Sequence, residues 1–194
     1  MLVNTLHDLI KTFKVRAKVI ITDEMTTRLW RGCGWKRFIV TDKVNVLVVE
    51  DSPGDARLIA EAFKETKIKT SVQVVRDGVD AMRFLRQNGA YVDAIRPDLI
   101  LLDLNLPRKD GREVLSEIKH DDHLKQIPVL VLTTSNHPQD IKYSYENHAN
   151  SYIVKPMDMD SFFQVIKNLE EFWFRVAKLP TYKQTARDWS ENIC

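Results

Sequence analysis

Short runs of apolar residues alternate with amphipathic stretches from Val44 onward. The apolar runs predict strands at residues 44–49, 71–75, 97–103, 127–133 and 151–154. Apolar residues at helical spacing predict helices around residues 58–63 and 81–85, and over residues 111–118, 139–147 and 158–177. Strands that alternate with helices in this way favour parallel pairing through right-handed crossovers. The central strands are continuously apolar, as expected of strands covered on both faces. The prediction is an α/β fold with a five-stranded parallel sheet, doubly wound, with helices on both faces.

Helix boundaries carry their own signals. Ser52-Pro53 provides an N-cap residue followed by proline at the first helical position. Asn88-Gly89 predicts the C-terminal cap of the helix around residues 81–85. Both signals support the element order that the apolar pattern predicts.

The first 43 residues do not follow this pattern. They carry nine Lys or Arg against four Asp or Glu, a net charge of +5, whereas residues 44–180 carry eighteen against twenty-one, a net charge of −3. Residues 30–37 are aromatic and basic. Three interpretations stay open: a docking arm, a nucleic-acid or membrane patch, and a loosely ordered extension or a start assigned too far upstream. The predicted organisation is a basic N-terminal extension at 1–43, one domain at 44–180 and a short tail at 181–194.

The two cysteines, Cys33 and Cys194, have no metal-ligand or redox-motif spacing, which predicts free thiols in a reducing cytoplasm. No apolar run approaches the roughly 18 residues of a membrane span. Charged residues such as Asp8 and Lys11 interrupt the start of the chain, so a signal peptide is not predicted. We therefore expect a cytoplasmic protein without a membrane span.

Polar side chains follow four of the predicted strands. Glu50 and Asp51 end the first strand, Asp103 the third, Thr133 the fourth and Lys155 the fifth. Because the carboxyl ends of parallel strands meet at one edge of the sheet, where open α/β folds bind ligands, we expect these groups to converge. Each signal is weak alone, since such residues commonly cap helices or form turns, but their joint occurrence at strand ends predicts a site.

These residue types suit phosphoryl chemistry with a divalent metal. Mg²⁺ prefers oxygen ligands and is commonly held by one or two carboxylates beside a phosphate, a role that fits Glu50, Asp51 and Asp103. A carboxylate such as Asp103 can accept a phosphoryl group as an acyl phosphate. Mg²⁺ and Lys155 would stabilise the charge on the transferring oxygens, and the hydroxyl of Thr133 can donate a hydrogen bond to one of them.

These segments resemble the receiver domains of two-component response regulators. The resemblance lies in Leu47–Ser52, Leu101–Pro107 with Asp110-Gly111, Val131–Ser135 and Tyr152–Pro156. The intervals from Asp103 to Thr133 and from Thr133 to Lys155, 30 and 22 residues by subtraction, are those of the family. The resemblance covers about residues 44–180. The Glu-Asp-Ser-Pro-Gly-Asp start at residues 50–55, the long connection at 87–96 and the ending at 172–180 are most similar to single-domain regulators of cyanobacterial phytochrome histidine kinases.

The resemblance implies a flavodoxin-like fold with strand order 2-1-3-4-5 and a role for each site residue. Asp103 would be the phosphoacceptor, and the ligands of Mg²⁺ would be Asp103, Asp51, Glu50 through water, and the backbone carbonyl of Asn105. Thr133 and Lys155 would contact the phosphoryl group, and Tyr152 would turn inward as Thr133 moves. Lys155-Pro156 would carry a cis peptide bond. Glu50 departs from the pattern, because the family usually has aspartate there.

The implied function is a response regulator that takes its phosphoryl group from a sensor histidine kinase and is not itself a turnover enzyme. Phosphorylation would alter the face formed by residues 139–147, 151–154 and 158–177. Only fourteen residues follow Pro180, so we expect output through protein contacts, including a homodimer, and no nucleic-acid binding. The large apolar residues of the last helix, among them Phe172 and Trp173, favour such a surface. One alternative is a receiver-like scaffold that never accepts phosphate, but the intact set of site residues disfavours it. A second is an aspartyl-nucleophile phosphatase, which is disfavoured because such enzymes carry a second acid where this chain has Asn105.

Overall fold

Parallel strands form the centre of the described part of the chain, which comprises residues 43–65 and 68–180 in this computed structural model. The five strands pair in the order β2-β1-β3-β4-β5, and every pair is parallel. Their bounds are β1 Val44–Val49, β2 Thr70–Val75, β3 Leu99–Leu102, β4 Val129–Thr133 and β5 Ser151–Val154. The predicted fold class and strand order are confirmed.

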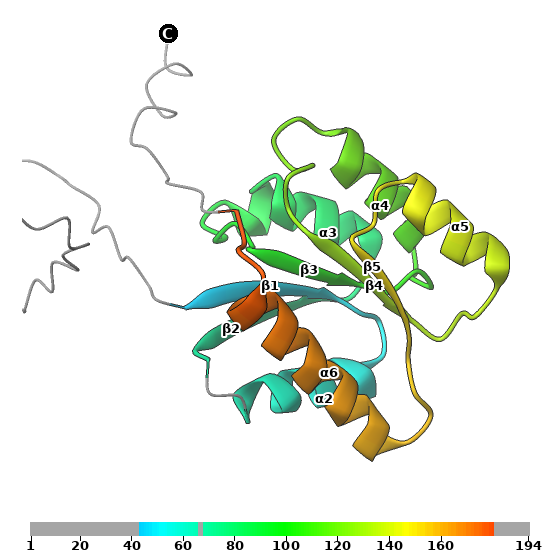
Figure 1. Cartoon of the computed structure of the whole chain (residues 1–194). Helices are drawn as coiled ribbons and strands as arrows, with labels where there is room; N and C mark the ends of the chain where they lie inside the picture. Colours follow the sequence, from blue (N-terminus) through cyan, green and yellow to red (C-terminus); the bar gives the residue numbers. More distant parts are fainter. Residues whose placement is uncertain (1–42, 66–67, 181–194) are drawn as a thin grey trace, which may run out of the picture. The chain divides into compact units, whose positions relative to one another are not determined.

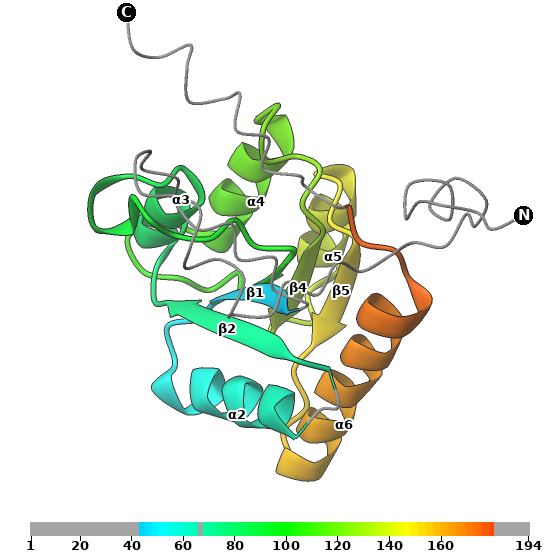
Figure 2. The same cartoon turned by 90° about the vertical axis from the view of Figure 1, so that its left-hand side faces the viewer.

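Helices cover both faces of the sheet (Figures 1 and 2). One face packs against α2 Pro53–Lys64 and α6 Met159–Glu170, and the other against α3 Gly78–Leu85, α4 Gly111–His120 and α5 Pro138–Glu146. Successive side chains of a strand point to opposite faces. Accordingly Val46 and Val48 belong to the apolar cluster under α2 and α6, whereas Leu47 and Val49 belong to the cluster under α3 and α4. This two-sided burial explains the continuous apolar runs of the central strands.

Local capping fixes where the helices begin and end. The hydroxyl of Ser52 accepts a hydrogen bond from the amide of Asp55, and Pro53 is the first helical residue of α2, as predicted.

The predicted cap at Gly89 is wrong. The chain leaves α3 through Gln87 at φ 53°, where the amides of Gln87 and Asn88 donate to the carbonyls of Phe84 and Arg83, respectively. Gly89, also at positive φ, begins the short helix η1, Gly89–Tyr91. The residue that ends α3 in the left-handed conformation is therefore Gln87, which this Schellman pattern of hydrogen bonds places there, and not the nearby glycine.

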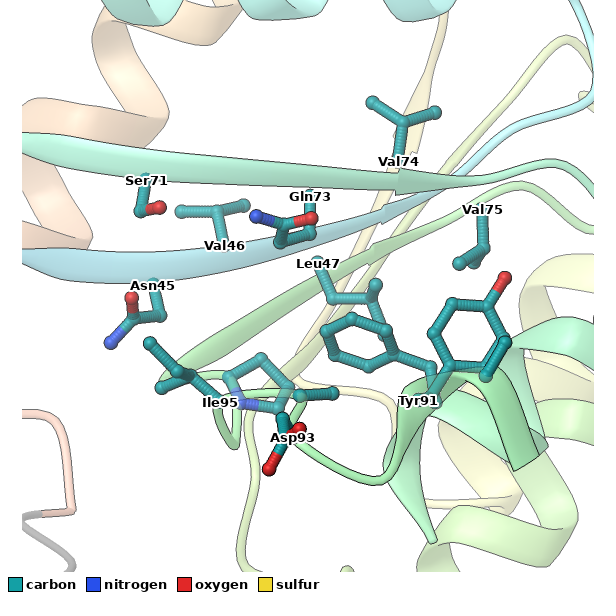
Figure 3. A pocket seen from close by; sticks show the side chains of 14 residues that line it. Asn45, Val46, Leu47, Ser71, Gln73, Val74, Val75, Tyr91, Asp93 and Ile95 are labelled. Atoms are coloured by element: carbon teal, nitrogen blue, oxygen red, sulfur yellow. The ribbon is translucent and has the colours of Figure 1, made fainter. Parts of the chain in front are cut away.

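A hollow of about 310 Å³ lies beside β2 and the first half of β1 (Figure 3). The short α3 and the connection that follows it form one wall, with Phe84, Tyr91 and Ile95, and Asn45 and Gln73 lie on the sheet side. None of the residues that line it belongs to the polar strand ends described below. This hollow is therefore separate from the candidate site.

Some predictions concern parts of the chain outside these residues. The predicted N-terminal extension, except for Lys43, and the tail at 181–194 lie outside the described residues. Among the described helices, none is both long and apolar enough to cross a membrane.

Candidate functional site

Three carboxylates meet where β1 and β3 end. Glu50 and Asp51 follow β1, and Asp103 follows β3, which is paired with β1. The amide of Asp103 donates to the carbonyl of Val49 at 3.0 Å, which fixes the two strand ends side by side. One carboxylate oxygen from each of the three acids lies within 4.8 Å of the other two. The structure thus brings together the three acids that the sequence placed at strand ends.

The three acids differ in their exposure. Glu50 and Asp103 are 2% and 5% exposed, whereas Asp51 faces solvent. Adjacent strand residues point to opposite faces, but the chain turns here, and the amide of Ser52 donates to Glu50 Oε1 at 3.1 Å. The amide of Asn105 donates to Asp103 Oδ1 at 3.1 Å. Hydrogen bonds from nearby backbone amides therefore orient the carboxylates of Glu50 and Asp103 towards each other.

Lys155 supplies the positive charge of the site. Its Nζ atom donates to Glu50 Oε2 and Asp103 Oδ2, both at 2.6 Å, and to Asp55 Oδ2 at 2.9 Å. Burial alone would lower the pKa of Lys155, but the hydrogen bonds to Asp103 and Glu50 outweigh it and hold the pKa well above its usual range. The ammonium therefore stays protonated while buried among carboxylates.

The carboxyl of Glu50 holds a proton more tightly than an ordinary glutamate. Burial raises the pKa of the Glu50 carboxyl to about 7, although its hydrogen bond from Lys155 opposes this effect and Asp103 adds to it. A single ammonium does not neutralise carboxylates this close together. The cluster is therefore suited to a further cation.

The peptide bond between Lys155 and Pro156 is trans, as are the other peptide bonds of the described residues, so the predicted cis bond is wrong. The trans form is the lower in energy even before proline, by about 0.5–1 kcal/mol. Lys155 reaches the acids in this form, and its amide donates to the carbonyl of Thr133 at 2.7 Å.

Thr133 and Tyr152 lie in a second layer beside this cluster. Thr133 is fully buried at the end of β4, and its hydroxyl accepts a hydrogen bond from the amide of Ser135 at 3.4 Å. The hydroxyl of Tyr152 donates to the carbonyl of Ser135 at 2.9 Å. Both side chains thus contact the same loop between β4 and α5, which connects them to each other through Ser135.

A polar network that the sequence analysis did not identify fixes the far side of this loop. Ser135 Oγ donates to Asp140 Oδ2 at 2.5 Å, and Arg112 binds the same carboxylate through Nε at 2.9 Å and Nη2 at 2.7 Å. The hydrogen bonds from Arg112 and Ser135 hold the pKa of Asp140 below its usual range. Arg112 also pairs with Asp110, the N-cap of α4. The network therefore joins the start of α4 to the start of α5.

Asp55 is a further residue at the site whose contact was not predicted from the sequence. Its sequence signals are its place one helical turn after Asp51, in the segment where Ser52-Pro53 begins a helix, and its position at the end of the Glu-Asp-Ser-Pro-Gly-Asp start. In the structure it binds Lys155, so the ammonium has three carboxylate partners rather than two.

The donor set suits a hard divalent cation. Glu50, Asp51 and Asp103 offer carboxylate oxygens close enough together to share one ion, and carboxylate oxygen with water is the ligand set that Mg²⁺ prefers. The exposed Asp51 leaves one side of the cluster open to water. The arrangement combines a buried carboxylate, a fixed ammonium and carboxylate oxygens that can share a cation, which are the groups that phosphoryl transfer to a carboxylate requires.

Comparison with known proteins agrees with this chemistry. The model of the response regulator receiver domain family matches residues 46–167. The chain therefore belongs to the response regulator receiver domain family, whose members are phosphoacceptor signalling proteins.

Individual relatives are similar over most of the described residues. Response regulator Rcp1 of Synechocystis sp. is 49% identical over 135 residues, which cover 70% of this chain and 92% of Rcp1. The structure of the Mn²⁺-bound form of Rcp1 is similar with a TM-score of 0.69 at 48% identity, over 71% of this chain and 99% of that one. The structure of the phosphorylated cyanobacterial phytochrome response regulator RcpA is similar with a TM-score of 0.70 at 52% identity, over 72% of this chain and 99% of that one.

Proposed function

We propose that this protein accepts a phosphoryl group on Asp103 from a sensor histidine kinase and thereby switches a protein-binding surface. The observation that carries the proposal is the position of Asp103, buried at 5% exposure with the ammonium of Lys155 at 2.6 Å and two further carboxylates close by. The carboxylate can attack phosphorus. The fixed ammonium beside it can then stabilise the negative charge of the phosphorylated product.

The transfer step follows from these contacts. An oxygen of Asp103 forms a bond to phosphorus while the phosphorus–nitrogen bond of the donor phosphohistidine breaks. The electron pair of that bond goes to the imidazole nitrogen, which takes up a proton from water. Lys155 then donates to a phosphoryl oxygen, and the hydroxyl of Thr133 becomes a second donor when the loop after β4 moves towards the site.

Glu50, Asp51 and Asp103, with the backbone carbonyl of Asn105, are proposed to hold Mg²⁺. The clustered oxygens support this assignment, as does the Mn²⁺-bound structure of Rcp1. When bound, the cation neutralises charge on the transferring oxygens. The departure from aspartate at Glu50 is compatible with the site, because its carboxylate lies within the cluster.

The experiment that tests the proposal uses the full chain, Mg²⁺ and a small phosphodonor such as phosphoramidate. We expect intact mass measurement to detect one added phosphoryl group, and mild base to remove it, as an acyl phosphate requires. No adduct under conditions that phosphorylate a known receiver domain would contradict the proposal.

Cation binding should depend on pH through Glu50. Because the pKa of Glu50 is raised to about 7, a proton occupies this carboxyl below that pH and must leave when the cation binds. We therefore expect the affinity for Mg²⁺ to rise about tenfold per pH unit below about pH 7 and to level off above it. Calorimetric titration across this range measures the effect. A Glu50→Gln variant should bind more weakly and lose most of the pH dependence, and an unchanged profile in that variant would assign the titration elsewhere.

The switch is proposed to change the surface formed by α5, β5 and α6. Tyr152 on β5 is bonded to the same loop as Thr133, so a shift of Thr133 alters the support of Tyr152. The phosphoryl group, which carries a charge of about −1.5 to −2, drives the shift. This coupling supports a phosphorylation-dependent change in partner choice.

The same surface is proposed to form a homodimer. Phe172, in the π-helical turn η2 Glu171–Val176 after α6, is 52% exposed, and a hollow of about 360 Å³ lies beside it between β5 and α6. Other large residues of the last helix are accounted for, since Phe162 is buried and Phe174 packs on Phe63. Exposed apolar patches commonly mark contacts.

A matched pair of charge insertions tests the dimer. We expect Phe172→Lys to shift the beryllofluoride-treated protein from dimer to monomer in size-exclusion chromatography with light scattering. Val92→Lys, at a residue that is 60% exposed in the connection after α3, should leave the dimer intact. A dimer that survives Phe172→Lys, or a wild-type protein that stays monomeric, would contradict this interface.

The partner kinase is proposed to be of the phytochrome type, in the cytoplasm. The similarity to Rcp1 and to the phytochrome response regulator RcpA supports the kinase class. Two cysteines without a disulfide or metal-site pattern support the compartment. Phosphotransfer from a purified phytochrome kinase, compared with an unrelated histidine kinase, measures the preference.

A further inference from the structure

Asp55 is a fourth carboxylate beside the proposed phosphoacceptor site, and it lies outside the group of three that can share a cation. Its Oδ2 atom accepts a hydrogen bond from Lys155 Nζ at 2.9 Å. Its side chain is 33% exposed, whereas the other two partners of Lys155, Glu50 and Asp103, are almost fully buried. Asp55 thus holds the solvent side of the ammonium.

The start of α2 fixes this position. Pro53 is the first helical residue, so Asp55 is the third, and helical side chains tilt towards the N-terminus of their helix. That tilt directs Asp55 towards the end of β1, where the site lies. The amide of Asp55 is bonded to the hydroxyl of Ser52, so the cap of the helix does not require the carboxylate. A general effect of an acid in the first turn accounts for a small stabilisation but not for the contact with Lys155.

The donors of Lys155 are fully used. An ammonium has three N–H groups, and here they serve three carboxylates, Glu50, Asp103 and Asp55. To bind a phosphoryl oxygen, Lys155 has to release one of them. Asp103 loses its own negative charge when it becomes an acyl phosphate, and Glu50 belongs to the carboxylates that a cation would attract. Asp55 keeps its charge and is outside that group, so it remains the competitor for the ammonium.

We propose that Asp55 is a positioning residue that holds Lys155 in the resting protein and competes with the phosphoryl group for its ammonium. This inference rests on the proposed role of Asp103 as the phosphoacceptor. It assigns Asp55 a function in setting how tightly the site binds an anion.

Removal of the charge should therefore strengthen anion binding. Asparagine has the shape of aspartate but is a weaker acceptor without charge, so Asp55→Asn leaves Lys155 freer to donate to the incoming group. One unit charge at about 4 Å, screened as in water, corresponds to about a fivefold change in an equilibrium constant. We expect Asp55→Asn to bind beryllofluoride in the presence of Mg²⁺ about fivefold more tightly than wild type.

The experiment compares four proteins by ¹⁹F nuclear magnetic resonance titration with beryllofluoride at fixed Mg²⁺. These are wild type, Asp55→Asn, Asp55→Glu and Glu61→Gln. Glu61 is an exposed acid on the same helix whose carboxylate pairs with Lys64, so its variant removes an equal charge without touching Lys155. We expect tighter binding only for Asp55→Asn, with Asp55→Glu close to wild type. The ¹⁵N signal of the Lys155 ammonium, recorded without beryllofluoride, should shift in Asp55→Asn and not in Glu61→Gln.

The outcomes separate this inference from the proposed function. If wild type binds beryllofluoride and Asp55→Asn matches Glu61→Gln in both affinity and ammonium signal, the positioning role of Asp55 is wrong while the phosphoacceptor role stands. If Asp55→Asn binds more weakly than wild type, Asp55 supports the anion rather than competing with it, and the proposal is likewise overturned. If wild type neither binds beryllofluoride nor takes up a phosphoryl group, the proposed function itself fails.

Discussion

Replacement of Asp103 with asparagine is expected to abolish the phosphoryl adduct completely. The amide has no anionic oxygen to attack phosphorus, and none of the neighbouring carboxylates takes its place. Glu50 is bonded to Lys155 and the amide of Ser52, and Asp51 lies on the exposed side of the cluster. The fold should persist, because Lys155 keeps Glu50 and Asp55 as partners. Intact mass measurement after incubation with phosphoramidate and Mg²⁺ provides the comparison with wild type.

A matched control makes the loss specific to the site. Asp122→Asn makes the same chemical change at an acid whose side chain is 84% exposed and whose partner is Lys125. That variant should be phosphorylated as fully as wild type. A base-labile adduct that still forms on Asp103→Asn would place the phosphoacceptor at another residue.

Replacement of Gly111 with alanine should give the largest loss of stability among single methyl additions near the site. A Cβ atom at Gly111 would lie 2.1 Å from the carbonyl oxygen of Asp103 and 2.6 Å from the Cα atom of Leu104. These are backbone atoms of the segment that carries Asp103, the proposed phosphoacceptor, so they cannot move aside without displacing it. We expect a loss of about 3 kcal/mol or more in the free energy of unfolding, measured by urea denaturation.

Gly54 provides the control for this substitution. It lies in the first turn of α2, and a Cβ atom there would meet only the hydroxyl of Ser52, at 3.8 Å. Gly54→Ala should therefore raise stability by up to about 1 kcal/mol, because alanine loses less backbone freedom on folding. Equal unfolding midpoints for Gly111→Ala and wild type would show that α4 does not need its close approach to Asp103.

The apolar pattern predicted the sheet well because strands that are covered on both faces have little freedom in composition. The bounds of β1 and β5 agree with the sequence prediction. The pattern was less informative about the end of the last helix, predicted over residues 158–177. In the structure α6 ends at Glu170 and continues as the π-helical turn η2. Apolar spacing does not determine whether a carbonyl accepts from the fourth or the fifth following residue, so this change could not be predicted.

The acids of the site were predictable because the rule that carboxyl ends of parallel strands meet depends on topology alone. Glu50, Asp51, Asp103 and Lys155 all follow strands, and the structure brings them together. Asp55 was missed because it lies on a helix. Its contact with Lys155 depends on the angle at which α2 leaves β1 and on the reach of a long side chain, neither of which the residue spacing determines. The trans bond before Pro156 was also missed, because the cis prediction rested on resemblance alone.

The weak apolar packing of α5 has a thermodynamic consequence. Ser144 is the one buried residue in this helix. Near the N-terminus of the helix, Asp140 binds Arg112 of α4 and Ser135 of the loop after β4 through polar bonds. A movement of α5 therefore exchanges hydrogen bonds and exposes little apolar surface. Because the heat capacity change of a transition follows the apolar surface that it exposes, the movement should carry only a small one. The enthalpy difference between two positions of α5 should then be nearly constant with temperature, so the logarithm of their equilibrium constant should fall on a straight line against inverse temperature.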